Sequence, residues 1–216
     1  SFNGDISDWD VSRVDHMGTM FSFAGNFNRD LGSWDVSNVV SMSGMFLQAR
    51  SFNQDITEWD VVNVNDMGSA FSGAVSFNQD LGGWDLSRAS IMIEMLNNSG
   101  LSCENYSATL IGWAENPQTP QNIELGAEGM TYGNHAKAAR ETLISKGWEI
   151  TGDSEGACTV SSQQVRPKTI ALYPNPAVDV IHLDIDRSML YRILDSQGRA
   201  VDQGSTSGTI DVSQLP

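Results

Sequence analysis

Residues 2–26 read FNGDISDWDVSRVDHMGTMFSFAGN and residues 27–51 read FNRDLGSWDVSNVVSMSGMFLQARS, so one pattern returns after 25 residues. It returns twice more, without insertion or deletion, up to residue 100. Six positions have the same residue in all four copies, among them Phe2, Asn3, Asp5, Trp9 and Met17, and a seventh alternates between Ile and Leu. Such a fixed period predicts stacked coils, because one short coil cannot bury its apolar face without a neighbour.

Two shorter periods inside each copy predict the local structure. Apolar residues of the second half recur at helical spacing: Val14, Met17, Met20, Phe21 and Ala24. Around Trp9 and Val11, apolar and polar residues alternate, which indicates a very short strand. We therefore expect an α/β solenoid, in which each 25-residue coil is a short strand, a turn and a short helix.

The repeat pattern F-N-x-D-[IL]-x-x-W-D-[VL]-S-x-V-x-x-M-x-x-M-F-x-x-A over residues 1–100 resembles the BspA-like leucine-rich-repeat proteins. The resemblance implies a leucine-rich-repeat-like solenoid on a bacterial surface protein or a secreted protein. It also implies a role in adhesion to host or matrix proteins, and no enzymatic activity.

Residues 101–158 lose the period and are expected to form an α/β cap over the end of the solenoid. The strings L-S-x-x-N-Y-x-x-T-L-I-G-W and A-x-x-A-R-x-x-L-I-x-x-G-W-x-I-x-G-D resemble the segment that commonly closes such arrays. The pattern predicts a helix over 101–114, strands at 122–126 and 148–151, and a second helix that Gly147 ends. A cap is needed because an uncovered end exposes a strand edge and an apolar layer.

The chain has two cysteines, Cys103 and Cys158, at the two borders of this cap. A disulfide between them would stabilise the fold by about 4 kcal/mol on the chain-entropy model. Two unpaired thiols are the alternative, and a secreted protein favours the disulfide.

A polar segment at 159–168 is interpreted as a linker to a C-terminal domain at 169–216, where short strands alternate with turns and predict a small all-β sandwich. The Y-P-N-P-A start, the D-x-x-G-R turn and the I-D-V-S-x-L end resemble the C-terminal sorting domain of type IX secretion substrates. The motif residues are Tyr173, Pro174, Asn175, Pro176 and Gly198. The resemblance implies export by a Bacteroidetes-type bacterium, recognition by the secretion machinery and surface attachment. The family usually continues for about two more strands, so we interpret this domain as truncated and the chain as a fragment.

Composition excludes several classes of function. The formal charge of -15 disfavours nucleic acids and anionic membrane surfaces. No apolar run approaches the roughly 20 residues of a transmembrane helix. The three histidines lie in different segments, and no hydrolase, zinc-protease or phosphate-loop motif is present. We expect no catalytic residues and no cofactor.

Two columns of aspartates recur along the array: Asp5, Asp30, Asp55 and Asp80, and Asp10, Asp35, Asp60 and Asp85. Stacked carboxylates repel one another, so something must offset the repulsion. Each carboxylate could accept backbone N–H bonds in its own turn, the interpretation we favour, or adjacent coils could bind Ca²⁺. The recurring Asn3 and Trp9 positions are likewise more typical of backbone satisfaction and core packing than of ligand binding.

Three functions remain, of which the first is a surface-displayed module for an extracellular or host protein. Its partner-binding candidates lie in a variable column, Arg13, Asn38, Asn63 and Arg88, with a second set at Gln48, Arg50 and Val75. The second is a glycan-binding accessory module, which exposed Trp side chains would favour. The third is a structural spacer of a larger surface protein.

Overall fold

The computed structural model describes residues 2–158 and, nearer the C-terminus, residues 180–182, 189–194, 200–206 and 209–211. The chain divides into two compact units, Ser1–Ser162 and Gln163–Pro216. The segment interpreted as a linker, 159–168, lies outside the described residues.

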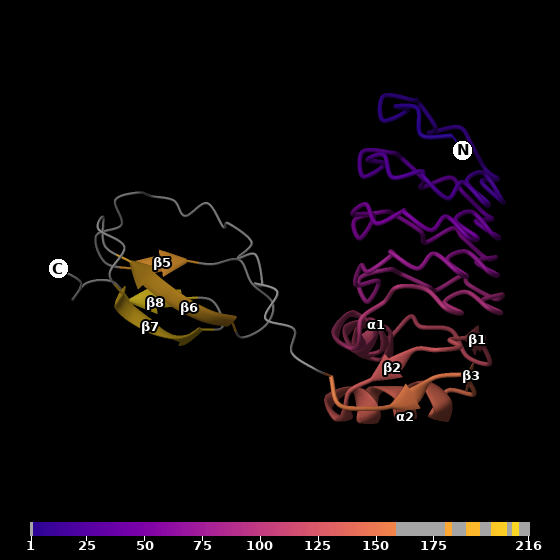
Figure 1. Cartoon of the computed structure of the whole chain (residues 1–216). Coiled ribbons are helices and arrows are strands. Elements are labelled where there is room, and N and C mark those ends of the chain that lie inside the picture. Colours follow the sequence, from indigo (N-terminus) through magenta and orange to yellow (C-terminus); the bar gives the residue numbers. More distant parts are fainter. Residues whose placement is uncertain (1, 159–179, 183–188, 195–199, 207–208, 212–216) are drawn as a thin grey trace. The chain divides into compact units, whose positions relative to one another are not determined.

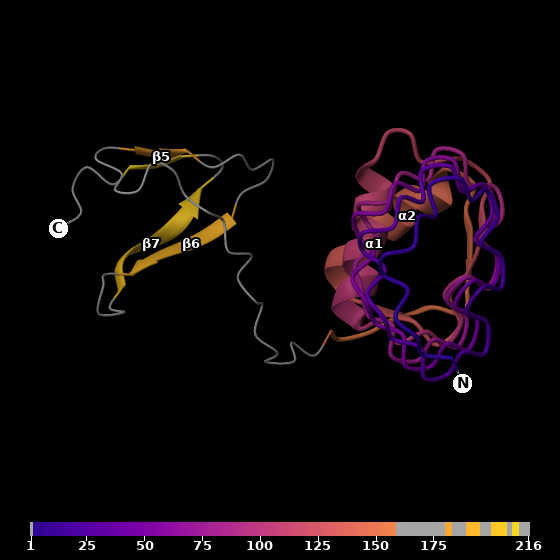
Figure 2. The same ribbon diagram turned by 90° about the horizontal axis from the view of Figure 1, so that it is seen from above.

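Residues 2–100 wind into four coils that lie one above the next (Figure 1) and superpose when viewed along the stack (Figure 2). Neighbouring coils are joined by backbone hydrogen bonds with a constant offset. Met17 N–H donates to the Ser41 carbonyl at 2.9 Å, and Met42 N–H donates to the Asp66 carbonyl at 2.8 Å. Parallel bridges link His16 to Ser41, Ser41 to Asp66 and Asp66 to Ile91. The 25-residue period is therefore one coil.

The expected short helix over residues 14–24 is wrong. Alternate N–H groups, those of Met17, Thr19, Phe21 and Phe23, donate to the next coil, at Ser41, Ser43, Met45 and Leu47. Between them, the N–H groups of Met20 and Ser22 donate three residues back, to the carbonyls of Met17 and Thr19. Thr19 and Phe23 both have φ 57°, in the left-handed region. A helix needs every N–H along its axis and right-handed dihedrals throughout, so neither condition is met.

The expected strand at Trp9–Val11 is also absent. Trp9 N–H donates to the Ile6 carbonyl and Val14 N–H to the Val11 carbonyl, which makes two turns instead of a ladder. Among residues 2–100, ladder pairing is confined to single bridges such as His16–Ser41. The alternation of apolar and polar residues there reflects turns that point every second side chain inward.

Aromatic side chains form the interior of the stack. Rings of Phe27, Phe52 and Phe77 follow one another at 6.1 Å between centroids. A second column, including Phe46, packs beside the first, with its ring 4.0 Å from that of Phe52. All four of these residues are essentially fully buried. Burial of such large side chains in register contributes to the hydrophobic free energy of the array.

Residues 101–158 cover the last coil. They form α1 (Cys103–Glu115), β1 (Glu124–Gly126), β2 (Thr131–Tyr132), the 3₁₀ helix η1 (Asn134–Ala136), α2 (Lys137–Ser145), β3 (Glu149–Thr151) and β4 (Ser154–Glu155). β1 pairs with β3 and β2 with β4, both parallel. Ser102 caps α1 by accepting a hydrogen bond from Asn105 N–H.

This cover continues the coil-to-coil hydrogen bonds. Leu96 and Asn98 donate their N–H groups to the carbonyls of Gly126 and Glu128, and Met92 forms a parallel bridge with Leu125. On α1, Trp113 Nε1 donates to the Leu81 carbonyl at 2.8 Å, as Trp34, Trp59 and Trp84 donate to carbonyls of the coil before them. The segment thus presents to the fourth coil the contacts that a fifth coil would make.

Among its described residues, the second unit has two antiparallel strand pairs. β5 (Val180–His182) pairs with β8 (Thr209–Asp211), and β6 (Met189–Leu194) pairs with β7 (Ala200–Thr206). The register between β6 and β7 shifts at Ile193/Leu194. The sandwich expected for this region stays a prediction.

Candidate binding surface

Residues 3–13 and their equivalents at 28–38, 53–63 and 78–88 form a repeated polar edge. On this edge, each aspartate of the two Asp columns accepts a hydrogen bond from the backbone N–H two residues later, which closes a turn. Asp10 Oδ1 accepts hydrogen bonds from Ser12 N–H at 3.1 Å and Ser12 Oγ at 2.6 Å. Gly32 N–H donates to Asp30 Oδ1 at 2.8 Å in the same way. These are the turn bonds favoured over Ca²⁺ from the sequence.

The turn bonds also change how the carboxylates ionise. Hydrogen bonds from the side chain and backbone of Ser12 hold the pKa of Asp10 below its ordinary value, and Ser37 does the same to Asp35. The pKa of Asp5 is lowered by the backbone N–H and then the hydroxyl of Ser7. In the first two coils, these donors therefore offset part of the repulsion between the carboxylates.

The recurring asparagines join one coil to the next. Asn28 N–H donates to Asn3 Oδ1 at 3.1 Å, and Asn53 N–H donates to Asn28 Oδ1 at 2.9 Å. At the covered end, Asn78 Oδ1 accepts from Ser102 N–H at 2.8 Å and from Asn105 Nδ2 at 2.9 Å. This column stabilises the stack, since each amide oxygen satisfies a backbone donor of its neighbour.

The variable column proposed for partner binding is largely used inside the molecule. Asn38 Nδ2 donates to the Ser12 carbonyl at 2.8 Å, and Asn63 Nδ2 to the Ser37 carbonyl at 2.7 Å. Arg88 donates in turn to Asn63 Oδ1 at 2.7 Å. Arg13 occupies the same position in the first coil. A partner would have to compete with bonds that three of these four side chains already make.

The tryptophan column is part of the core in three coils. Trp34, Trp59 and Trp84 are buried, and their Nε1 atoms donate to the carbonyls of Ile6, Leu31 and Ile56. Trp9 alone in this column is exposed, at 57%.

A second flank of the stack is both exposed and variable. We define the variable flank as residues 16–25, 41–50, 66–75 and 91–100. It carries large apolar side chains that are 42–71% exposed: Met20, Phe23, Val75, Ile91 and Ile93. Of the second set of candidates, Arg50 and Val75 are exposed on this flank, and Gln48 is partly buried. Sequence reasoning did not select Phe23, Ile91 or Ile93, although Ile91 stands where other coils have His16, Ser41 and Asp66.

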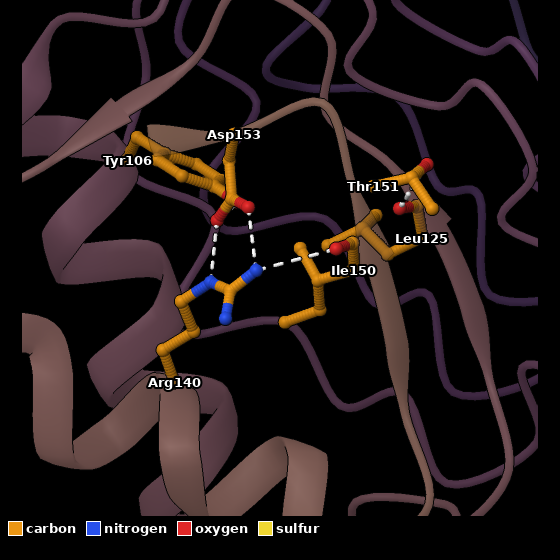
Figure 3. Close-up of polar contacts among 6 residues, drawn as sticks. All are labelled: Tyr106, Leu125, Arg140, Ile150, Thr151 and Asp153. Atoms are coloured by element: carbon orange, nitrogen blue, oxygen red, sulfur yellow. Dashed lines mark hydrogen bonds and ion pairs between the residues drawn. The ribbon is translucent and has the colours of Figure 1, made fainter. Parts of the chain in front are cut away.

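An ion pair fixes the covering segment (Figure 3). The Asp153 carboxylate accepts from Arg140 Nε at 2.7 Å and Nη2 at 2.6 Å, and from the Tyr106 hydroxyl at 3.0 Å. The Asp153 side chain is 1% exposed. Burial and the neighbouring Asp153 charge raise the pKa of Tyr106 well above its ordinary value. The phenol therefore stays protonated and serves as a structural donor.

Cys103 and Cys158 form a disulfide with Cα atoms 5.2 Å apart. Glu104, His135 and Cys158 place one possible metal-ligand atom each within 4.8 Å of the other two. Within the described residues, this is the one cluster of three such side chains. Because the Cys158 sulfur is bonded to Cys103, two donors remain, too few for a metal site. The Asp columns hold no such group among the described residues.

Comparison with known families assigns the repeats. The model of a family described as "Mycoplasma protein of unknown function, DUF285" matches residues 1–109 of the 216. The chain belongs to the DUF285 family. The DUF285 match spans all four coils and runs into α1. A finer assignment to BspA-like leucine-rich repeats stays a prediction.

A second family model, "Secretion system C-terminal sorting domain", matches residues 171–216. It confirms the predicted sorting domain and indicates type IX secretion to the cell surface or the medium. It also implies interaction with the type IX secretion machinery. The motif residues Tyr173, Pro174, Asn175, Pro176 and Gly198 lie outside the described residues.

No curated protein and no solved structure matched this chain. Within the described residues, no helix is long and apolar enough to cross a membrane.

Proposed function

We propose that this DUF285 protein is a non-enzymatic binding or adhesion protein, exported by the type IX system of a Bacteroidetes-type bacterium. In this proposal the coils are a leucine-rich-repeat-like solenoid, and the variable flank contacts an extracellular protein. Secretion to the surface supports the proposal, because an exported repeat array meets proteins of the host or matrix there.

The observation that carries the proposal is the contrast in exposed side chains between the two sides of the stack. On the polar edge the repeated groups bond to their own turn or to a neighbouring coil. On the variable flank, Phe23, Val75, Ile91 and Ile93 are exposed and differ from their counterparts in the other coils. The same flank carries the exposed Arg50. Exposed aromatic, apolar and arginine side chains are typical of protein interfaces.

The two alternatives have less support. A glycan-binding module would use a row of exposed tryptophans, but Trp34, Trp59 and Trp84 are buried. A pure spacer has no use for exposed isoleucines such as Ile91 and Ile93.

The test is a binding screen of the full chain against arrayed extracellular-matrix proteins and glycans at physiological salt. We expect a saturable protein hit that the double substitution Ile91→Ser/Ile93→Ser weakens at least tenfold, about 1.4 kcal/mol. Ile144→Ser on α2 is the matched control, because Ile144 is 41% exposed and the two flank isoleucines are 42% and 45% exposed.

Each outcome assigns a class. A glycan hit abolished by Trp9→Ala would overturn the protein-binding proposal in favour of the accessory module. Equal loss with Ile144→Ser would show that the flank carries no specific interaction. The absence of any hit would favour the spacer.

A further inference from the structure

The disulfide of the covering segment lies beside two further side chains that metals use as ligands. Cys103 and Glu104 are the first two residues of α1, and His135 lies in η1. His135 Nε2 is 3.8 Å from Glu104 Oε2, and the Cys158 sulfur lies within 4.8 Å of both ligand groups. In the oxidised chain the two sulfurs are bonded to each other, so neither is a thiolate that could bind a metal.

A glycine lets this group assemble. A Cβ atom at Gly133 would lie 2.6 Å from the Cys158 sulfur and 2.7 Å from His135 Nδ1. Atoms do not approach one another that closely, so any other residue would push the sulfur and the imidazole apart. Gly133 has φ -80°, an ordinary value for any residue. The close approach of the two ligand groups, and not the backbone conformation, therefore requires glycine here.

A buried hydroxyl points at the same sulfur. Ser107 is 0% exposed, and its Oγ lies 3.8 Å from Cys158 Sγ. The same oxygen accepts a hydrogen bond from Gly133 N–H at 2.9 Å. A disulfide sulfur carries no hydrogen, so the hydroxyl is the donor in the contact with Cys158. It would donate more strongly to a thiolate, and donors of this kind orient sulfur ligands around a metal.

Reduction frees two thiols at this place. A dithiol reductant passes two electrons and two protons to the bond between Cys103 and Cys158. The S–S bond breaks, two thiols form, and the dithiol closes to its own disulfide. The thiol of Cys103 stands at the N-terminus of α1, which favours its thiolate. Together with Glu104 and His135, the reduced protein then has four donors where the oxidised protein has two.

We propose that the reduced form of this protein binds one Zn²⁺ ion through Cys103, Glu104, His135 and Cys158. Zn²⁺ takes sulfur, nitrogen and carboxylate ligands in a tetrahedron, and its bond lengths place the ligand atoms about 3.3–3.8 Å from one another. The distance between Glu104 and His135 lies at the upper end of this range. The two cysteines have Cα atoms 5.2 Å apart, so side-chain rotation brings their sulfurs to the same separation. Binding releases the two thiol protons.

The ion would make the link that the disulfide makes in the oxidised protein. All four ligands come from the protein, which is typical of structural zinc and leaves no open position for a substrate. Two ligands belong to the first turn of α1, and Cys158 ends the covering segment. The covering segment is thus joined to α1 in reducing and in oxidising surroundings alike, and oxidation of the two thiolates releases the ion.

The test titrates the full chain with Co²⁺, a spectroscopic probe of zinc sites, after reduction by a dithiol and removal of the reductant without oxygen. We expect one equivalent of Co²⁺ to produce a thiolate-to-cobalt charge-transfer absorption, which Zn²⁺ then abolishes by displacing the probe. The oxidised chain should show no such absorption. Zn²⁺ should also raise the melting temperature of the reduced chain by several degrees, because it binds the folded state.

Variants separate a four-ligand site from binding by the thiols alone. His135→Ala should lower the Zn²⁺ affinity of the reduced chain by at least about tenfold, since loss of even an indirect partner of a metal costs that much. His16→Ala should leave the affinity unchanged. It is the matched control, because His16 also lies beside a carboxylate, 3.1 Å from Asp15. Replacing both cysteines by Ser should abolish the charge-transfer absorption.

The other outcomes overturn the proposal. A reduced chain without the charge-transfer absorption would show that the freed thiols form no metal site. Equal Zn²⁺ affinity of the wild type and His135→Ala would assign the ion to the cysteines alone. If reduction unfolds the covering segment, Zn²⁺ must restore the circular dichroism and the melting transition of the first unit, and failure to restore them would also contradict the site.

Discussion

The two ends of the stack carry the same motif in different surroundings. At the covered end, Trp84 and Met92 are buried beneath residues 101–158, while at the other end Trp9 and Phe2 are more than half exposed. Trp9 and Trp84 occupy the same position of the motif, so the neighbouring segment decides whether that residue belongs to the core. In a repeat array, the free energy of each position therefore resides largely in the interface to the next unit.

The largest expected difference in stability is between alanine substitutions of Trp84 and of Trp9. Trp84→Ala removes a fully buried side chain and its bond to the Ile56 carbonyl, and should lower the free energy of unfolding by about 3–5 kcal/mol. Trp9→Ala, at the open end, should cost less than about 1 kcal/mol. Urea unfolding followed by circular dichroism measures both, and equal losses would show that Trp9 is packed in solution.

The disulfide sharpens the comparison at the covered end. Its sequence separation is 55 residues, so replacing both Cys103 and Cys158 by Ser should destabilise the first unit by about 4 kcal/mol on the loop-entropy model. Thermal melts with and without reductant check this, with the double variant as a control that reductant must leave unchanged. A mass gain of two hydrogens on reduction verifies the bond, and an unchanged melt of the wild type would contradict the expected stabilisation.

A smaller difference is expected between the asparagines of the two ends. Asn78→Ala removes the acceptor of two hydrogen bonds to the cover and should cost about 1–2 kcal/mol. Asn3→Ala removes one exposed bond, from Asn28 N–H, and should cost about 0.5–1 kcal/mol. Chemical denaturation of the two variants in parallel tests the ranking, which a larger effect of Asn3→Ala would reverse.

Acid should weaken the polar edge of the first two coils, toward the open end of the stack. The folded-state pKa values of Asp5, Asp10 and Asp35 are depressed, so these groups stabilise the fold above their unfolded pKa. That contribution is lost as the pH falls through the folded-state pKa values. The melting temperature should therefore drop between about pH 5 and about pH 2, and Asp35→Asn should reduce the drop slightly. An identical pH profile for Asp35→Asn would remove Asp35 from the explanation.

Chelation is expected to have the smallest effect. Because each Asp Oδ1 named above is bonded to its own turn, EDTA should leave the melting temperature unchanged. A fall of several degrees that Ca²⁺ restores would instead assign the Asp columns to metal binding.

The period and the core columns could be predicted from sequence because burial in register demands the same residue type in every coil. The helix could not be excluded that way. Met17 and Phe21 return to the core after four residues, close to the helical repeat, while the left-handed dihedrals fall on Thr19 and Phe23, which are not glycines. A left-handed backbone conformation is usually predicted from Gly or Asn, so it could not be predicted at these two residues.

The direction of side chains along the stack was equally hidden. Asn38 and Asn63 vary with Arg13 and Arg88, which suggested a free binding column, yet the asparagines reach back to the preceding coil. Variation at one position of the repeat shows that the core does not need a particular residue there. It does not show whether the side chain bonds to the neighbouring coil. The variable flank is recognised by the solvent exposure of side chains such as Ile91, which the sequence alone does not give.

The disulfide has a mechanical consequence. Tension entering the first unit from the sorting-domain side reaches Cys158 and passes directly through the sulfur bridge to Cys103, at the start of α1. Residues 104–157 then form a slack loop that carries no part of the force, so the Arg140–Asp153 ion pair is not stretched. For a protein displayed at a surface, pulling would first test the contacts between α1 and the last coil, and the covering segment would keep its fold until those contacts had parted.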